Sequence, residues 1–194
     1  RGTASVVGLA AVVLQKRDPQ AVMAVLTADH FIENVAGFQQ ILISADQLAQ
    51  RGYLVTLGIQ PSFPSTGYGY IQRGEPLDES SQQDGFRVVK FKEKPNEELA
   101  REMLRRGDHL WNSGMFIWRV DRIQEEFRRQ MPELARILDQ IAASWSTAWQ
   151  TETLKKLWPQ IKPQTIDYGI MEHAEHVAVL PGAGLGWSDV GSWD

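Results

Sequence analysis

"VMAVLTADH", residues 22–30, decides the fold, because five apolar residues are followed directly by a polar turn. An apolar run this short is typical of a strand in a parallel sheet, which is buried on both faces. The run YLVTLGI at residues 53–59 predicts a second such strand, and the segments 3–16 and 34–50 that precede the two strands are expected to be helices. The order helix, strand, helix, strand predicts an α/β fold with a mostly parallel mixed sheet flanked by helices.

The rest of the chain continues this mixture of strands and helices. Thr3 is expected to cap the first helix and Asn96 a later one, and Pro132 is expected to interrupt another. No linker is long enough to split the chain, so we expect a single domain over residues 1–194. The further strands are expected at 66–71, 86–95, 110–120 and 176–180, the further helices at 97–106, 121–143 and 165–173, and a polar loop at 74–85.

Composition excludes several classes of protein. The 194 residues are 43% hydrophobic and 23% charged, the balance of a globular protein, and no apolar run approaches the roughly 20 residues that span a bilayer. The net charge is −4 without a basic block, which disfavours nucleic acid as a partner and favours small molecules. Cysteine is absent, which excludes disulfides and thiol chemistry and agrees with a cytoplasmic location.

Two aspartates far apart in the sequence are candidate metal ligands. Asp29 follows the first apolar strand, and Asp189 lies a few residues past the last one. Ligands of open α/β sheets bind at the carboxyl ends of strands, and Mg²⁺ is commonly held by one or two carboxylates together with substrate phosphates and water. On spacing alone, a simple turn or capping role for each aspartate is favoured.

Other motifs are ambiguous when each is considered alone. Gly67 and Gly69 in TGYGYI indicate either a bulge or the close approach of a ligand. Glu93 and Lys94 can bind sugar hydroxyls and a phosphate, although a solvated charge pair is favoured. The glycine-rich segment 182–186 has neither a Gly-Lys-Ser/Thr ending nor a following helix and is interpreted as a turn. The histidines and serines lack the spacing of zinc hydrolases or nucleophile elbows.

Several segments together resemble the mannose-1-phosphate guanylyltransferases of the sugar nucleotidyltransferase superfamily. The resemblance covers essentially the whole chain and implies a Rossmann-like nucleotide-diphospho-sugar transferase fold. Its most specific motifs are WNSGMF and GWSDVGSW. The segments that carry it, in the family's order, are RGTA, VMAVLTADHFI, TGYGYI, VVKFKEKP, WNSGMFIW, QTIDYGIMEH and GWSDVGSWD.

The resemblance implies an activity and assigns roles to residues of this chain. The expected reaction joins mannose 1-phosphate to GTP, giving GDP-mannose and pyrophosphate. Asp29 and Asp189 become metal ligands for Mg²⁺ and, with Lys94, catalytic residues. The nucleotide would be contacted by Arg1 and Thr3. The sugar-phosphate pocket would be formed by Gly67, Glu93, Lys94 and Asn112.

Asn112 and Gly114 raise the question why an amide and a glycine interrupt an otherwise apolar strand. Under the resemblance, Asn112 donates and accepts hydrogen bonds with sugar hydroxyls, and Gly114 lets the turn approach the ring. The structural alternative is a plain hairpin turn enclosed by tryptophans.

Three residues depart from the family pattern. Thr27 stands where the family usually has proline, which affects backbone stiffness. Gly2 replaces an asparagine, which weakens the nucleotide contact expected of that segment. His173 replaces a lysine, so that charge neutralisation at this position would depend on pH.

The family's N-terminal G-x-G-x-R-L loop and its C-terminal domain are not found in these residues, so the chain is expected to be a fragment. One alternative is therefore a truncated or degenerate module that binds a sugar phosphate without catalysis. Another is a related hexose-1-phosphate nucleotidyltransferase that uses UTP or dTTP. The sequence leaves the oligomeric state open, with a homodimer as one option.

Overall fold

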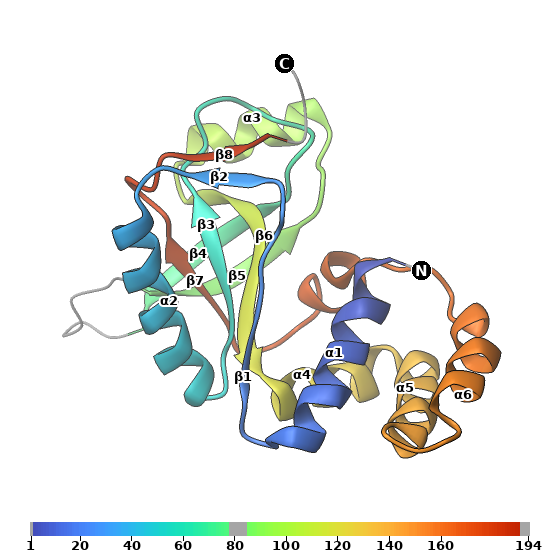
Figure 1. Cartoon of the computed structure of the whole chain (residues 1–194). Coiled ribbons are helices and arrows are strands. Elements are labelled where there is room, and N and C mark those ends of the chain that lie inside the picture. Colours follow the sequence, from blue (N-terminus) through green and yellow to red (C-terminus); the bar gives the residue numbers. More distant parts are fainter. Residues whose placement is uncertain (1, 78–84, 191–194) are drawn as a thin grey trace. The chain divides into compact units, whose positions relative to one another are not determined.

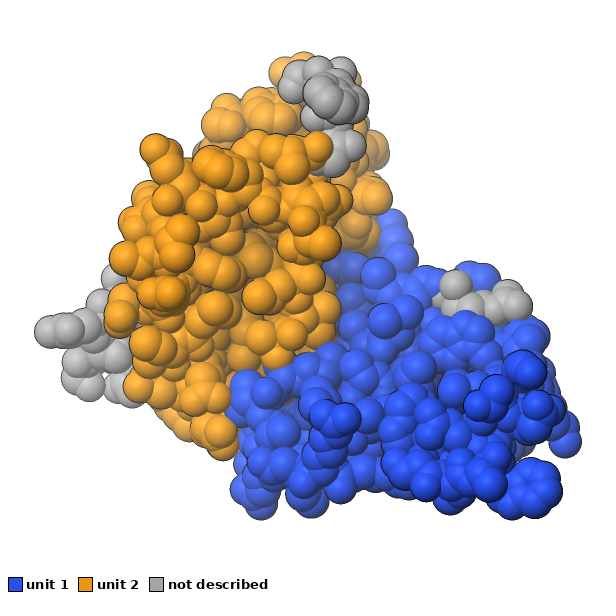
Figure 2. Space-filling view, in the orientation of Figure 1, with its two compact units in different colours: residues 1–23, 119–174 blue, residues 24–118, 175–194 orange. Residues whose placement is uncertain are grey.

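The computed structural model describes residues 2–77 and 85–190. The chain forms two compact units (Figure 2): residues 1–23 with 119–174, and residues 24–118 with 175–194. Each unit is assembled from two separated stretches of sequence, and this explains why no linker is visible in the sequence. We call the first the helical unit and the second the sheet unit.

A six-stranded mixed sheet is the framework of the fold (Figure 1). The expected α/β architecture of a mixed sheet with helices is thereby confirmed. The strands lie in the order β1 (Val22–Val25), β6 (His109–Arg119), β3 (Leu54–Ile59), β7 (Val177–Pro181), β5 (Phe86–Lys92) and β4 (Tyr70–Pro76).

The directions of the strands differ from the mostly parallel arrangement that we expected. Strands β3 and β7 are parallel, whereas the β3–β6, β4–β5, β4–β6 and β5–β7 pairs are antiparallel. The apolar run at residues 53–59 predicted correctly that β3 is buried throughout, whereas β1 is only partly buried and its Ala24 is exposed. Burial on both faces carries no information on the direction of the neighbouring strand.

A second, two-stranded sheet was not predicted. It pairs β2 (His30–Ile32) with β8 (Trp187–Asp189) in antiparallel register. Each strand is only three residues long, which is too short to show a period in the sequence. We call this pair the β2–β8 ribbon.

Two helices of the sheet unit begin at asparagine caps. Helix α2 (Val35–Gln50) begins after Asn34, whose Oδ1 accepts a hydrogen bond from the N–H of Gly37 at 2.9 Å. Helix α3 (Glu97–Arg106) begins after Asn96, whose Oδ1 accepts from the N–H of Leu99 at 2.9 Å. The Asn96 cap is the one predicted from the sequence, and it satisfies a backbone donor that the helix itself leaves without a partner.

The helical unit surrounds its own apolar core. A break at Pro132 is confirmed, because α4 ends at Gln130 and α5 begins at Pro132. Ile123, Phe127 and Ile141 are buried on the inward faces of these two helices. The elements of this unit are α1 (Thr3–Arg17), α4 (Val120–Gln130), α5 (Pro132–Ser144), α6 (Gln150–Leu157), η1 (Trp158–Gln160) and the π-helix η2 (Asp167–Met171).

The start of α1 differs from the sequence prediction. The N-cap is Gly2, not Thr3, and no side chain caps this helix. The Thr3 hydroxyl instead accepts a hydrogen bond from the N–H of Ile166 at 2.9 Å. Gly2 has φ +82°, and a Cβ there would lie 2.2 Å from the carbonyl oxygen of Gln164. Glycine at this position, where the family has asparagine, is therefore required by the backbone.

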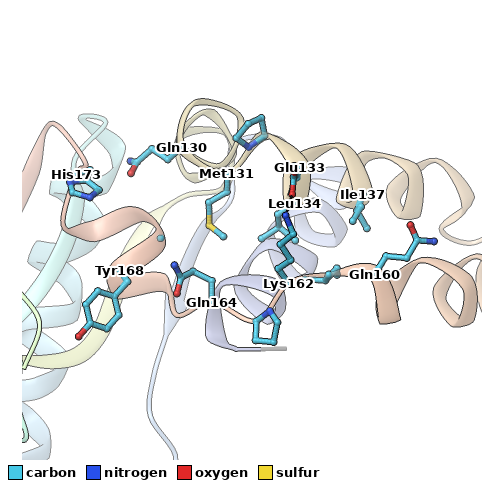
Figure 3. A pocket seen from close by; sticks show the side chains of 14 residues that line it. Gln130, Met131, Glu133, Leu134, Ile137, Gln160, Lys162, Gln164, Tyr168 and His173 are labelled. Carbon is cyan, nitrogen blue, oxygen red and sulfur yellow. Dashed lines mark hydrogen bonds and ion pairs between the residues drawn. The ribbon is translucent and has the colours of Figure 1, made fainter.

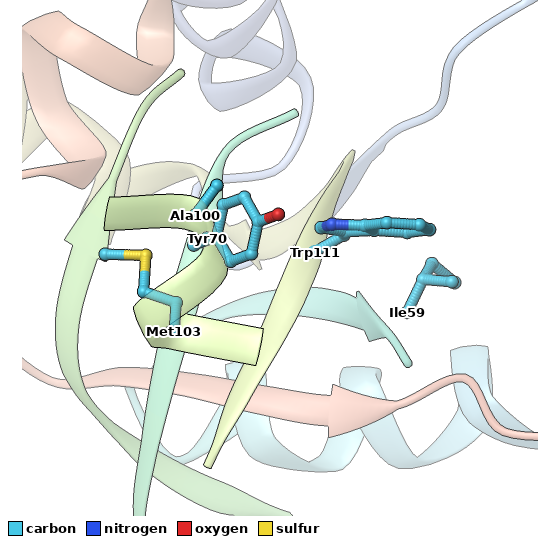
Figure 4. Close-up of a cluster of buried hydrophobic side chains, with 5 residues drawn as sticks. All are labelled: Ile59, Tyr70, Ala100, Met103 and Trp111. Carbon is cyan, nitrogen blue, oxygen red and sulfur yellow. The ribbon is translucent and has the colours of Figure 1, made fainter. Parts of the chain in front are cut away.

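The core of the sheet unit includes a cluster in which aromatic and aliphatic side chains pack (Figure 4). The half-buried side chains of Tyr68, Leu99 and Trp187 pack against this cluster. In the part of the chain that the structure describes, no helix is long and apolar enough to cross a membrane. The cluster consists of Ile59, Tyr70, Ala100, Met103 and Trp111.

Candidate active site

The β2–β8 ribbon brings the two candidate metal ligands together. His30 pairs with Asp189 across the ribbon, and the N–H of Val190 donates to the carbonyl oxygen of Asp29 at 3.2 Å. Asp29 is exposed and Asp189 is half-buried, so solvent reaches both residues. Residues that are separated by most of the sequence are thus neighbours through backbone pairing.

The electrostatics of His30 agree with this placement. Burial lowers the pKa of His30, and the negative charges of Asp189 and Asp29 oppose that shift. Both carboxylates therefore act on one imidazole ring. Such interactions between exposed charges are screened over about 8 Å at physiological salt, in agreement with the backbone pairing of this region.

The donor set at the ribbon suits a hard cation. Among residues 2–77 and 85–190, no cluster of three or more histidine or acidic side chains is arranged to enclose a metal. Two carboxylates with open access are instead the arrangement expected for Mg²⁺, which keeps waters and takes further oxygens from substrate phosphates. The chemistry of Asp29 and Asp189 fits that ion.

A second group of predicted residues converges around Gly69. A Cβ at this position would lie 2.4 Å from Oε2 of Glu93 and 3.3 Å from Cβ of Asn112. The N–H of Asn112 donates to the carbonyl oxygen of Gly69 at 2.8 Å. The glycine just before β4, the carboxylate just after β5 and the amide within β6 thus lie at one place. We call this group the candidate sugar pocket.

The close approach falls on Gly69, whereas Gly67 was the glycine that we assigned to the pocket. At Gly67 an added Cβ would meet only the Ser65 hydroxyl, at 3.6 Å, and the residue is exposed. Its N–H donates to that same hydroxyl at 3.1 Å. The sequence pattern does not distinguish the two glycines, because they differ only in the side chains from distant segments that surround each one.

Glu93 and Lys94 differ sharply in exposure. The Glu93 side chain is 12% exposed and that of Lys94 is 59% exposed, with 4.0 Å between Oε1 and Nζ. Lys94 has φ +41°, a backbone conformation that residues other than glycine rarely adopt and that costs of order 1–3 kcal/mol. Such strain concentrates at functional sites, and here it turns a cation outward next to a recessed carboxylate.

Asn112, Ser113 and Gly114 form a bulge within β6 and not a hairpin turn. Thr56 pairs with Phe116 and Gly58 with Asn112, so one residue of β3 stands opposite three of β6. Gly114 has φ +72° at the centre of this bulge, a value that favours glycine.

Polar side chains satisfy the backbone of the bulge. Oδ1 of Asn112 accepts from the N–H of Gly114 at 3.1 Å, and the Ser113 hydroxyl accepts from the N–H of Met115 at 3.2 Å. The Thr56 hydroxyl lies 3.2 Å from Oδ1 of Asn112 and 3.1 Å from the carbonyl oxygen of Met115. The acceptor oxygen of Asn112 is therefore engaged within the protein.

The predicted nucleotide contacts, Arg1 and Thr3, stay a prediction. Arg1 lies outside the described residues. Thr3 belongs to the helical unit, and its hydroxyl is engaged by Ile166. The ribbon and the candidate sugar pocket belong to the sheet unit.

A separate pocket of about 770 Å³ lies in the helical unit, between the start of α5, residues 160–164 and η2 (Figure 3). Tyr168 and His173 of the TIDYGIMEH motif line it, together with three glutamines. None of the described residues that we predicted for the active site lines this pocket.

Sequence reasoning missed two aromatic contacts of the ribbon. Trp187 Nε1 donates to Nδ1 of His30 at 3.1 Å, and the ring of Tyr68 lies against the ring of Trp187, with centroids 5.7 Å apart. The only signal in the sequence was that both aromatic residues belong to motifs singled out for other reasons, TGYGYI and GWSD.

Comparison with known proteins identifies the class to which this mixed α/β fold belongs. The chain belongs to the nucleotidyl transferase family, whose sequence profile matches residues 1–194. Over its whole length it is 38% identical to mannose-1-phosphate guanylyltransferase 2 of Escherichia coli O157:H7 and 37% identical to mannose-1-phosphate guanylyltransferase of Escherichia coli strain K12. These relatives confirm the resemblance seen in the motifs. The chain spans about 41% of the length of each.

Solved structures agree with this assignment. A structure described as mannose-1-phosphate geranyltransferase from Thermus thermophilus matches with a TM-score of 0.85 and 33% identity, over 100% of this chain and 53% of the other. One described as mannose-6-phosphate isomerase from Helicobacter pylori matches with a TM-score of 0.80 and 25% identity, over 97% of this chain and 71% of the other.

Proposed function

We propose that the protein containing this chain transfers GMP from GTP to α-D-mannose 1-phosphate, giving GDP-mannose and pyrophosphate. The observation that carries the proposal is the register of the ribbon, which sets Asp189 opposite His30 and next to Asp29. The names of the similar curated proteins support mannose 1-phosphate and guanine as the substrate classes.

The proposed chemistry is attack of a sugar-phosphate oxygen on the α-phosphorus of GTP. A phosphate monoester has a second pKa of about 6 and is largely dianionic at neutral pH, so that it attacks without a general base. The absence of a paired serine and histidine from the described residues of the site agrees with this. Catalysis then consists of alignment and neutralisation of charge.

Each site residue has a role in that alignment. Asp29 and Asp189 would hold Mg²⁺, which supplies charge neutralisation on the phosphates when bound. Lys94, exposed two residues past the end of β5, would pair with phosphate oxygens. Glu93 accepts hydrogen bonds from sugar hydroxyls, and Asn112 keeps the bulge of β6 in the shape that borders the sugar.

The test is turnover by the full-length protein with Asp189→Asn. We expect pyrophosphate release to fall by about 100-fold or more, because the substitution removes a charged ligand of the Mg²⁺ that would neutralise the reacting phosphates. Asp46→Asn, an exposed change on α2, is the matched control and should leave turnover unchanged. Unchanged turnover of Asp189→Asn would refute its metal role.

The same assay decides the nucleotide. GTP, UTP and dTTP are compared at equal concentration with mannose 1-phosphate, and we expect GTP to give the largest kcat/KM. A preference for UTP or dTTP would reassign the protein to another hexose-1-phosphate nucleotidyltransferase. Binding of the sugar phosphate without turnover of any nucleotide would show that the protein is a binding module without catalysis.

A further inference from the structure

A continuous series of ring contacts joins the candidate sugar pocket to the β2–β8 ribbon. The centroids of Trp111 and Tyr68 are 4.9 Å apart, with the rings tilted by 53°. Those of Tyr68 and Trp187 are 5.7 Å apart at 70°, and those of Trp187 and His30 are 5.1 Å apart at 86°. Edge-to-face and tilted pairs at these distances are attractive.

One end of this series is fixed to the core beside the candidate sugar pocket. Trp111 is 4% exposed and belongs to the buried cluster of Figure 4. The next residue along β6 is Asn112, and Tyr68 directly precedes Gly69, the position enclosed by Glu93 and Asn112. The ring of Tyr68 is therefore anchored next to the residues that would hold the sugar phosphate.

The other end holds the carboxylate-bearing ribbon. Tryptophan can only donate, so the 3.1 Å contact from Trp187 Nε1 makes Nδ1 of His30 an unprotonated acceptor. His30 is the cross-strand partner of Asp189. Burial raises the pKa of the Tyr68 hydroxyl, and the charge of Asp189 raises it further. Tyr68 thus lies within electrostatic reach of a proposed metal ligand.

The ribbon needs such support. Its two strands have three residues each, and an isolated two-stranded sheet is at best marginally stable in water. Phosphoryl transfer requires the reacting atoms to approach within about 3–3.5 Å, and a displacement of about 1 Å can cost 100-fold in rate. A small shift of the ribbon relative to the candidate sugar pocket would therefore lower kcat.

We propose that Tyr68 is a positioning residue, whose ring, held between Trp111 and Trp187, sets the distance from the ribbon carboxylates to the candidate sugar pocket. This inference deepens the proposed function and rests on it. The ring carries the role, because the contacts to both tryptophans are ring contacts.

The kinetic test compares Tyr68→Leu, Tyr68→Phe and Phe63→Leu in the full-length protein. Phe63 is the matched control, because its ring contacts the same Trp111 ring at 4.9 Å but is 52% exposed and forms no link in the series to Trp187. We expect Tyr68→Leu to lower kcat by about 10- to 100-fold, with KM for each substrate changed less than about threefold, because alignment and not binding is lost. Tyr68→Phe and Phe63→Leu should stay within about threefold of the wild type.

Two kinetic outcomes would overturn the proposal. One is an unchanged kcat per folded molecule in Tyr68→Leu, with the folded fraction measured by circular dichroism. The other is a loss in Tyr68→Phe as large as in Tyr68→Leu, which would assign the effect to the hydroxyl.

Backbone hydrogen exchange of β8 provides a readout that needs neither metal nor turnover. The amides of residues 187–190, including the Val190 N–H bonded to Asp29, should exchange faster in Tyr68→Leu than in Phe63→Leu. Equal exchange in the two variants would overturn the proposal. If the wild-type protein made no nucleotide sugar, the proposed function would be refuted. The hydrogen exchange of β8 would still test whether Tyr68 holds the ribbon in place.

Discussion

At the scale of single residues, the shape of the candidate sugar pocket depends on the absence of a side chain at Gly69. Gly69 leaves room for the Glu93 carboxylate, whose Oε2 would lie 2.4 Å from an added Cβ. Real Cβ atoms essentially never show a contact that short, so a side chain there forces Glu93 to move. The pair of glycines in TGYGYI could be read from the sequence, but which of them faces the carboxylate could not, because Glu93 arrives from another strand.

Gly69→Ala should therefore impair sugar-phosphate recognition. We expect KM for mannose 1-phosphate to rise by about tenfold or more, since a hydrogen bond to a charged group contributes about 1.5–3 kcal/mol and Glu93 would be displaced. Steady-state kinetics of the full-length protein measure the change. Gly67→Ala, where the added atom meets only a hydroxyl at 3.6 Å, should have a clearly smaller effect. The opposite ranking of the two variants would contradict this geometry.

At the scale of elements, the bulge in β6 answers why polar residues interrupt an apolar strand. Asn112 and Ser113 supply acceptors for the N–H groups that the bulge takes out of the ladder, and Gly114 adopts the positive φ that the bulge requires. A buried backbone donor without a partner costs about 1–3 kcal/mol, which is why the polar side chains are needed there. The strand was predictable from its apolar residues, but the bulge was not, because it is defined by the register against β3.

Two threonines near this bulge allow a matched test of stability. Thr56 is fully buried and its hydroxyl bonds to the bulge, whereas Oγ1 of Thr27 is buried and has no hydrogen-bond partner among the described residues. Thr56→Val should lower the free energy of unfolding by about 1–3 kcal/mol, because Met115 and Asn112 lose their donor. Thr27→Val has the same shape change but should leave stability equal or higher, because it removes an unpaired buried polar atom.

Urea unfolding of both variants measures the two effects. A loss of stability in Thr27→Val equal to that in Thr56→Val would show that packing, and not hydrogen bonding, controls this region.

Short elements and strand directions set the limit of prediction at this scale. The caps at Asn34 and Asn96 and the break at Pro132 depend on neighbouring residues, so the sequence predicted Asn96 and Pro132 correctly. The ribbon and the antiparallel placement of β6 depend on partners more than 50 residues away in the sequence. Thr3 was assigned to a cap because its partner, Ile166, is also distant in the sequence.

At the scale of the whole molecule, one buried histidine couples stability to pH. His109 is 6% exposed, and its Nδ1 lies 2.6 Å from Oδ1 of Asp108. Burial lowers the pKa of His109, and the Asp108 carboxylate only partly opposes that shift. Arg106 holds the pKa of Asp108 far below its ordinary value, so this carboxylate stays charged well into the acid range.

The sign of the pH effect follows from these directions. Since the pKa of His109 is lower in the folded state than its ordinary value of about 6.5, the unfolded chain binds the proton first as the pH falls. Stability is therefore fully present above about pH 6.5 and declines as the pH falls toward the folded pKa. Asp108, also with a lowered pKa, contributes stability that is lost only below its ordinary value of about 3.9.

His109→Asn should flatten the decline between about pH 7 and pH 5, the range that brackets the ordinary histidine pKa. The urea midpoint is measured at several pH values, and the slope against pH is compared with that of the wild type, so that an overall loss of stability in the variant does not affect the result. The pKa of His30 is also lowered, but His30 is present in both proteins, so its contribution to the two slopes cancels. Identical slopes would contradict a role for His109.

The sequence by itself determined the α/β class, the principal strands and helices, the Asn96 cap, the break at Pro132 and the family, because these follow from local periodicity, from side chains bonding to nearby backbone and from short motifs. The tertiary structure alone decided that the strand following Asp29 pairs with the strand of Asp189, that Gly69 and not Gly67 borders Glu93, and that Tyr68 lies between two tryptophans. Each of these arrangements depends on which distant strands pair and in what register. The free energy of strand pairing comes from contacts between two segments, so it cannot be read from either segment alone.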